Sequence, residues 1–151
     1  MAGIEIYSAA FSDGTIIPSR HAHDGGNVSP PLHWSGVPEG TTELLLMCED
    51  PDAPDGTFLH WLVSGIDPHT DGVDEGRTPL GGKQWPNGFG EIGWGGPQPP
   101  RGDQAHRYVF RLYALRDALH LPAKPNAGDI HRLADAGAIA DGSTVGLYQR
   151  Q

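Results

Sequence analysis

The sequence predicts a mainly β domain with one peripheral helix. Three observations support this class. The apolar runs are short and carry β-branched and aromatic residues, which favour strands. The 151 residues include 22 glycines and 14 prolines, spread between those runs as turn formers. One segment alone has a good helical pattern. At this length a chain forms one domain by default and can bury a sizeable core, so residues 1–151 are predicted to be a single domain.

Three runs are the main strand candidates. Residues 42–50 alternate with period two, residues 58–65 are almost continuously apolar around a histidine, and residues 106–115 form the longest run. Alternation assigns one face of the first run to Leu44, Leu46, Cys48 and Asp50. It assigns one face of the third run to His106, Tyr108, Phe110 and Leu112, and the opposite face to Arg107, Val109 and Arg111.

A helix is predicted near residues 126–134. Asn126 is a good N-cap and Asp129 lies in the first turn, where the helix dipole favours a negative charge. Ile130, Leu133 and Ala134 supply an apolar stripe. Residues 145–148 are expected to form a last short strand. The long turn-rich segments, which are typical of functional or ordered loops, are residues 17–38, 67–94 and 95–104.

Composition limits the function classes. The formal net charge is −9, with ten lysines and arginines in total, so no nucleic-acid partner is expected. Cys48 is the single cysteine, which excludes an intrachain disulfide and a cysteine-rich zinc site and favours a small buried apolar role. No segment has a signal-peptide pattern or the length of a membrane span, so a cytoplasmic protein is expected. No cofactor is predicted.

Two separated segments carry the candidate site. Residues 50–54, Asp-Pro-Asp-Ala-Pro, precede His60, and residues 95–97, Gly-Gly-Pro, precede His106 and Tyr108. Together they offer two imidazoles, two carboxylates, a phenol and glycine N–H groups that can form an anion-binding nest. This mixture suits a small anion, phosphate above all.

Each half also has an ordinary structural interpretation. Asp and Pro are common turn residues, and a histidine inside an apolar strand is often a core residue bonded to a backbone carbonyl. Position favours function, because Asp50 ends an apolar face and a partly desolvated carboxylate there needs a partner such as histidine. His60 and His106 are also candidates for acid–base chemistry with Asp50.

His21 and His23 form a His-x-His pair whose rings share one face of an extended strand. With His60 and His106 they offer the ligand set of a zinc or iron site. Pairs of this kind in loops are usually incidental, so no metal is predicted and the pair remains an alternative.

Taken together, these motifs resemble those of the phosphatidylethanolamine-binding protein family, in its bacterial and archaeal Raf-kinase-inhibitor-like branch. The resemblance runs nearly end to end, through Asn-Val-Ser-Pro-Pro-Leu-His-Trp at 27–34, Asp-Pro-Asp-Ala-Pro at 50–54, His-Trp-Leu-Val at 60–63, Gly-Trp-Gly-Gly-Pro at 93–97 and His-Arg-Tyr-Val-Phe at 106–110. One departure is Gln98, where members of this branch often have cysteine.

The resemblance implies a large central antiparallel sheet packed on a smaller sheet, with short peripheral and C-terminal helices. It also implies a pocket for phosphate, acetate or phosphoethanolamine-like anions. By motif position the lining residues would be Asp50, Asp52, His60, Gly96, Pro97, His106 and Tyr108, with Gly95 as the neighbouring choice for the glycine and Tyr148 near the rim. Bacterial relatives are often dimeric, which makes a homodimer an alternative to a monomer.

The sequence therefore favours a binding protein for a small anion or a phospholipid head group, with a regulatory role. Two alternatives stay open. One is an enzyme that uses a His/Asp acid–base pocket on a small metabolite, with Asp50, His60 and His106 as candidate catalytic residues. The other is a regulator of a protein partner such as a kinase, although kinase inhibition itself is not carried over from longer eukaryotic relatives.

Overall fold

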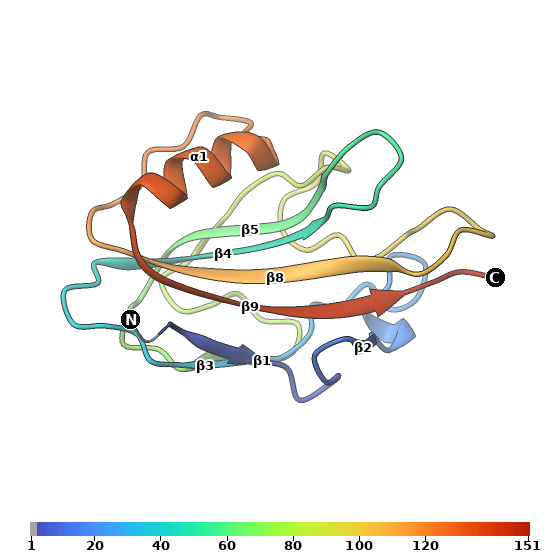
Figure 1. The fold of residues 1–151 in the computed structure, drawn as a ribbon, viewed down its shortest axis with the longest axis horizontal. Helices are drawn as coiled ribbons and strands as arrows, with labels where there is room; N and C mark the ends of the chain where they lie inside the picture. Colours follow the sequence, from blue (N-terminus) through green and yellow to red (C-terminus); the bar gives the residue numbers. More distant parts are fainter. Residues whose placement is uncertain (1–2) are drawn as a thin grey trace.

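The computed structural model describes residues 3–151 as two β-sheets and one α-helix (Figure 1). The larger sheet has six strands in the order β2-β9-β8-β4-β5-β7, and the smaller has three in the order β1-β3-β6. The strands of the larger sheet are β2 (Thr15–Ile16), β9 (Ala138–Tyr148), β8 (His106–Leu115), β4 (Glu43–Asp50), β5 (Phe58–Ile66) and β7 (Lys83–Gln84). Those of the smaller sheet are β1 (Glu5–Tyr7), β3 (Leu32–Ser35) and β6 (Gly72–Val73).

The four long strands of the larger sheet are antiparallel to one another. Strand β8 pairs with β4 on one side and with β9 on the other, while β5 pairs with the far side of β4. The short edge strand β2 pairs with β9 in parallel. This arrangement confirms the predicted mainly β class with a central antiparallel sheet and a smaller second sheet.

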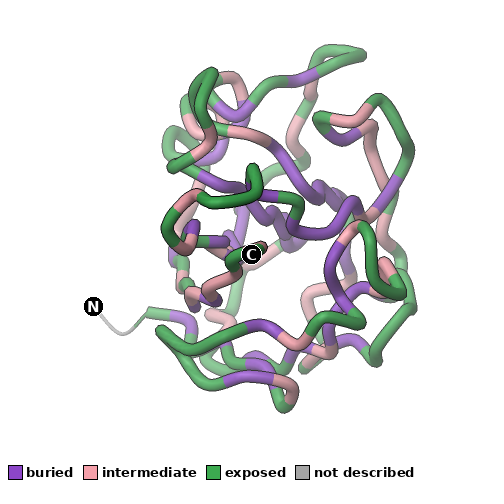
Figure 2. The backbone as a smooth tube through the Cα atoms, turned by 90° about the vertical axis from the view of Figure 1, so that its right-hand side faces the viewer, coloured by how far each residue is buried: buried purple, intermediate pink, exposed green. Residues whose placement is uncertain are grey.

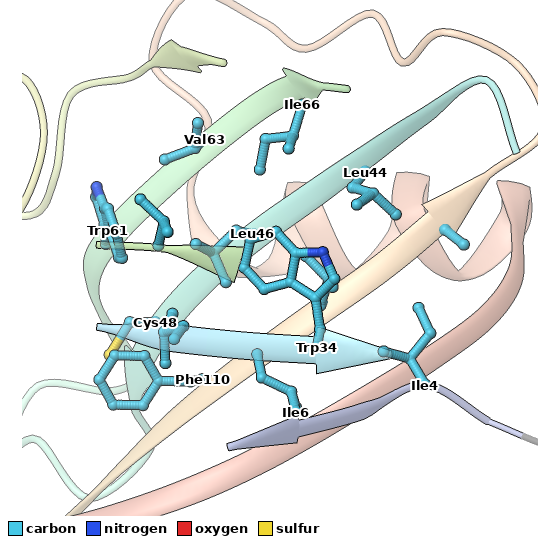
Figure 3. Packing of buried hydrophobic residues seen from close by; sticks show 14 of the residues in the cluster. Ile4, Ile6, Trp34, Leu44, Leu46, Cys48, Trp61, Val63, Ile66 and Phe110 are labelled. Atoms are coloured by element: carbon cyan, nitrogen blue, oxygen red, sulfur yellow. The ribbon is translucent and has the colours of Figure 1, made fainter. Parts of the chain in front are cut away.

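The two faces of the larger sheet are covered by different elements, as the period-two alternation requires. Leu44, Leu46 and Cys48 pack with the small sheet, represented in the core by Ile6 and Trp34 (Figure 3). The opposite face packs against helix α1 (Ala127–Gly137). Its buried residues include Leu45, Met47, Tyr113 and Leu115 from the sheet and Ile130 and Ala134 from the helix. Because both faces are covered, every residue of β4 is buried.

Helix α1 begins where its cap residue predicts. The Asn126 side chain accepts from the backbone N–H of Asp129, and the Asp129 carboxylate accepts from the N–H of Asn126, which forms a reciprocal capping box. The final strand is longer than expected: β9 begins directly after the helix at Ala138, whereas the sequence predicted a strand at 145–148. The alternation is weak before that point because Gly142 lies within the strand.

The turn-rich segments contain short elements that their composition hides. Residues 17–38 hold the 3₁₀ turn η1 (Ser19–His21) and strand β3, and residues 67–94 hold β6 and β7. Strands of two to four residues are too short to show a periodic pattern. Among the described residues, no helix has the length and apolarity needed to cross a membrane.

Candidate functional site

A β-bulge sets the direction of the His60 side chain. In the pairing of β4 with β5, Cys48 lies opposite Trp61 and Glu49 lies opposite Leu59, so the register omits His60. Leu59 packs on the helix side of the sheet and Trp61 on the other side, although residues two positions apart in a regular strand share a face. The extra residue breaks the alternation, and bulges commonly re-aim side chains next to functional sites.

Asp50 and His106 meet across the neighbouring strands β4 and β8. The His106 Nδ1 and Asp50 Oδ2 atoms are 2.7 Å apart, and both side chains are buried. The other carboxylate oxygen, Oδ1, accepts from the backbone N–H of Asp52 at 2.7 Å. Thus the turn at residues 50–54 holds the carboxylate in place by its own backbone, and the carboxylate holds the imidazole.

The second ring nitrogen of His106 also faces a carboxylate. Asp103 Oδ2 lies 3.0 Å from His106 Nε2. Burial alone lowers the pKa of His106, but the hydrogen bonds to Asp50 and Asp103 outweigh it and raise the pKa above its ordinary value. The ring is therefore favoured as an imidazolium that donates from both nitrogens.

His60 is held in the opposite protonation state. Its Nδ1–H donates to the carbonyl of Gly95 at 2.6 Å, and the N–H of Gly95 donates to the His60 carbonyl at 2.9 Å. Burial lowers the pKa of His60 to about 4, with the Gly95 hydrogen bond and the charge of Asp50 opposing the shift. A neutral ring with Nδ1 as the donor leaves Nε2 as a hydrogen-bond acceptor.

Tyr108 contributes a buried hydroxyl. The side chain is fully buried, and its Oη has no hydrogen-bond partner among the described residues. Burial raises the pKa of Tyr108, and the nearby Asp50 carboxylate raises it further, so the phenol stays protonated. Its ring also meets the edge of the His60 ring, with centroids 5.1 Å apart. An unpaired buried O–H is costly unless a ligand or water accepts its proton.

These side chains line one small cavity at the end of the sheet nearest the chain's C-terminus, where exposed turns surround the buried strand ends (Figures 1 and 2). Its volume is about 150 Å³. Four predicted residues reach it, and turns and aromatic side chains complete the wall. The lining residues are Asp50, Ala53, Pro54, Phe58, His60, Phe89, Gln98, Pro99, Pro100, His106 and Tyr108.

The other predicted pocket residues do not line this cavity. The Asp52 carboxylate instead binds Arg107 with two hydrogen bonds of 2.8 and 3.0 Å, which lower the pKa of Asp52 to about 2. Tyr148 lies opposite His106 in the β8–β9 pairing and packs against the core. Pro97 accepts through its carbonyl from the N–H of His23 at 2.9 Å, behind the pocket wall.

The expected nest of free glycine N–H groups is wrong at Gly95 and Gly96. The N–H of Gly95 bonds to His60, and that of Gly96 donates to Asn27 Oδ1 at 2.8 Å. A Cβ at Gly96 would lie 2.1 Å from the carbonyl oxygen of His21. The glycines therefore allow two loops to pack closely, and they support His60 from behind the cavity.

His21 and His23 do not join the two site histidines. His21 is buried and donates from Nδ1 to the carbonyl of Val28 at 2.7 Å. The His23 ring packs against Phe89 in a tilted arrangement, with centroids 4.3 Å apart. Within residues 3–151 no group of three or more His, Cys, Asp or Glu side chains is arranged to hold a metal ion.

Sequence reasoning missed several residues of the site. Phe58 and Phe89 form its aromatic wall, and Asp103 binds His106. Asn27 supports Gly96 with a backbone φ of 52°, a left-handed conformation that Asn tolerates better than most residues. Only Asp103 gave a usable signal, since the Arg-Gly-Asp turn just before His106 can direct a carboxylate back onto that histidine.

Comparison with known proteins gives a family to this fold and site. The sequence model of the phosphatidylethanolamine-binding protein family matches residues 7–149. The geometry defines a class of two-sheet β proteins with a small pocket at one end of the larger sheet. The chain belongs to the phosphatidylethanolamine-binding protein family, in its bacterial and archaeal branch. The expected fold is thus confirmed together with the resemblance.

Similar proteins come from distant microbes. The UPF0098 protein of Methanothermobacter thermautotrophicus is 42% identical over 146 residues, which cover 93% of this chain and 95% of the relative. A protein of Mycobacterium tuberculosis, named as a candidate lipoprotein (LppC), is 41% identical over 148 residues, 97% of this chain and 72% of the relative. The crystal structure of Escherichia coli YbcL matches with a TM-score of 0.89 and 31% identity, covering 99% of this chain and all of YbcL.

Proposed function

We propose that this protein binds a small oxyanion in the cavity: phosphate, a phosphomonoester head group such as phosphoethanolamine, or a carboxylate. One observation carries the proposal. The Tyr108 hydroxyl is fully buried, has no partner within hydrogen-bond distance among residues 3–151, and lines the cavity beside His106. A ligand that accepts a hydrogen bond there would satisfy this hydroxyl.

The polar atoms support a ligand that accepts and donates. Tyr108 can donate to an acceptor oxygen, and the cationic His106 ring supplies positive charge to an ionised oxygen where one of its carboxylate partners, Asp50 or Asp103, gives way. His60 Nε2 is an acceptor, which suits an O–H on the same ligand. A phosphomonoester monoanion has both kinds of oxygen. The apolar walls at Phe58 and Phe89 lower the local dielectric and strengthen each of these contacts.

Cavity size supports a head group rather than a whole lipid. A volume of about 150 Å³ is below the range typical of drug-sized ligands, about 300–1,000 Å³. Several heavy atoms fit, as in phosphate or acetate. The remainder of a phosphorylated molecule would lie outside, over the exposed lining residues Pro54, Gln98 and Pro100.

A matched pair of tyrosine variants tests the proposal. Inorganic phosphate, phosphoethanolamine and acetate are titrated separately, with binding followed by NMR chemical shifts. Tyr108→Phe removes one hydroxyl and is expected to weaken phosphate binding by about tenfold. The control, Tyr113→Phe, removes the hydroxyl of a buried tyrosine on the opposite face, bonded to His131, and should leave the affinity unchanged. Equal affinities for the wild type and Tyr108→Phe would contradict the proposal.

One observation favours acid–base catalysis as a second candidate function. The pKa values of His60 and His106 are displaced in opposite directions, so one wall of the cavity holds a base and another an acid. A screen of phosphorylated and carboxylated metabolites for turnover tests this. Turnover that is lost in Asp50→Asn would support the enzyme. If no metabolite is turned over, catalysis is not supported and anion binding remains the proposed function.

The proposed role is regulatory, in the cytoplasm, with a homodimer as the alternative to a monomer. Light scattering on the purified chain, with and without phosphate, decides between monomer and dimer.

Cell fractionation tests the compartment, and recovery in the membrane fraction would overturn the cytoplasmic assignment. A pull-down that yields no specific partner in either phosphate condition would count against a protein-regulating role.

A further inference from the structure

His106 has no ring nitrogen left for a ligand. Nδ1 bonds to Asp50 at 2.7 Å and Nε2 bonds to Asp103 at 3.0 Å, so both N–H groups are committed to carboxylates of the chain itself. An imidazolium offers only these two donors. The charge that would attract an oxyanion is therefore already matched by two carboxylates.

The two carboxylates differ in how they are held. Asp50 is buried and its other oxygen is fixed by the N–H of Asp52. The Asp103 side chain is 43% exposed, and its carboxylate accepts from His106 Nε2. Solvent on one side allows Asp103 to leave the ring without burying an unpaired charge, whereas Asp50 has no such freedom.

The backbone of Asp103, in contrast, is tied down. Its N–H donates to Pro100 at 3.2 Å, and its carbonyl accepts from the Gln149 side chain at 3.0 Å. Gly102, with a φ of 87°, forms the turn and donates to the carbonyl of Arg150 at 3.2 Å. The C-terminal segment thus fixes the backbone of the turn while the Asp103 side chain can move, so the Asp103 carboxylate stays at high local concentration next to His106.

We propose that Asp103 sets the anion affinity of the pocket: its carboxylate, which does not itself line the cavity, competes with external oxyanions for His106. This inference rests on the proposed anion-binding function. A weakly held carboxylate such as acetate offers His106 little more than Asp103 already does. Phosphate and phosphomonoesters carry more charge and more acceptor oxygens, so they are better able to displace Asp103.

Removal of the carboxylate tests the competition. Phosphate and acetate are titrated into the wild type, Asp103→Ala and Asp103→Asn by NMR. Asp103→Ala is expected to bind both anions at least about tenfold more tightly and by a similar factor, because loss of an internal competitor raises each apparent affinity equally. Asp103→Glu, which restores a carboxylate, should return the affinities toward those of the wild type. The side-chain signals of His106 should titrate at lower pH in Asp103→Ala, which a merely structural change in the loop would not produce.

A remote variant separates this effect from bulk charge. Asp117→Asn alters the net charge as Asp103→Asn does, but Asp117 is exposed and lies just after the end of β8 that is remote from the pocket. The anion affinities of Asp117→Asn should therefore stay within about twofold of those of the wild type. Equal gains in anion affinity for Asp117→Asn and Asp103→Asn would overturn this inference but not the proposed function. The same holds if the wild type binds phosphate and Asp103→Ala binds it no more tightly. If neither the wild type nor Asp103→Ala binds any of the anions, the proposed function fails with it.

Discussion

The Asp50 carboxylate and the His106 imidazole form a buried pair between adjacent strands, with 2.7 Å between Oδ2 and Nδ1. Their side chains are 4% and 6% exposed. Such a pair need not add much net stability, because removing two charged groups from water is itself costly. Breaking it is a different matter, since the remaining charge stays buried without its partner.

We therefore expect Asp50→Ala to lower the free energy of unfolding by about 3 kcal/mol, the range for one uncompensated buried partner. The effect of His106→Ala should be smaller in an Asp50→Ala background than in the wild type. Urea unfolding of the two single variants and the double variant measures this coupling. Additive losses would show that the two residues do not act as a pair.

The neighbouring pair of Asp52 and Arg107 should behave differently. Their side chains are 30% and 57% exposed, so solvent screens the interaction. Asp52→Ala is expected to reduce the free energy of unfolding by no more than about 1 kcal/mol. It should leave phosphate affinity unchanged, because Asp52 does not line the cavity. A large loss of phosphate affinity in Asp52→Ala, with the thermal midpoint preserved, would contradict this prediction and indicate that Asp52 contacts the ligand.

A second histidine–carboxylate pair attaches helix α1 to the sheet. His131 on the helix bonds to Glu49 Oε1 at 2.7 Å and to the Tyr113 hydroxyl at 3.2 Å. Glu49 is buried, and its Oε2 has no hydrogen-bond partner among the described residues. His131→Ala should therefore destabilise the protein by about 2 kcal/mol, because it leaves the carboxylate without its donor.

The matched background for that variant is Glu49→Gln, which keeps the shape and removes the charge. In this background His131→Ala should lower the free energy of unfolding by about 1 kcal/mol less. Amide hydrogen exchange in residues 127–137 should rise selectively in His131→Ala if the contact holds the helix. Uniform exchange across all strands would instead indicate a general loss of core stability.

The two pocket histidines should give opposite pH dependences of stability. His60 has a folded pKa of about 4 against 6.5 unfolded, so its contribution is present above pH 6.5 and is lost as the pH falls toward 4. The full difference corresponds to about 3 kcal/mol. His106 has a raised pKa, so its contribution is complete below pH 6.5 and is lost as the pH rises through its folded pKa.

Urea unfolding between pH 4 and 8 checks both signs. His60→Phe, which cannot titrate, should flatten the decline between pH 6.5 and 4, and His106→Gln should flatten the change above pH 6.5. Despite burial, hydrogen bonds to Asp50 and Asp103 raise the pKa of His106, whereas burial lowers the pKa of His60 against the opposing effects of the Gly95 carbonyl and the Asp50 charge. Unaltered pH profiles in these variants would contradict the assignments.

Alternation in the sequence was enough to predict the strands that build the site. It assigned Leu44, Leu46 and Cys48 to one face with Asp50 at its end, and it gave His106 and Tyr108 the same face of the longest strand. Both faces are as predicted, because burial on the two sides of a sheet leaves a period of two in any strand of useful length. The helix cap at Asn126 is likewise a local signal.

Tertiary structure alone decided the chemistry of the cavity. The bulge that re-aims His60 depends on the register of β5 against β4. The hydrogen bond that His106 donates to Asp103 depends on the turn that the C-terminal segment holds in place. The glycine N–H groups looked available in sequence, yet Asn27 and His60 occupy them. Patterns along the chain report which side of a strand is buried, but hydrogen-bond partners come from segments far apart in sequence, and only their packing determines which donors remain free.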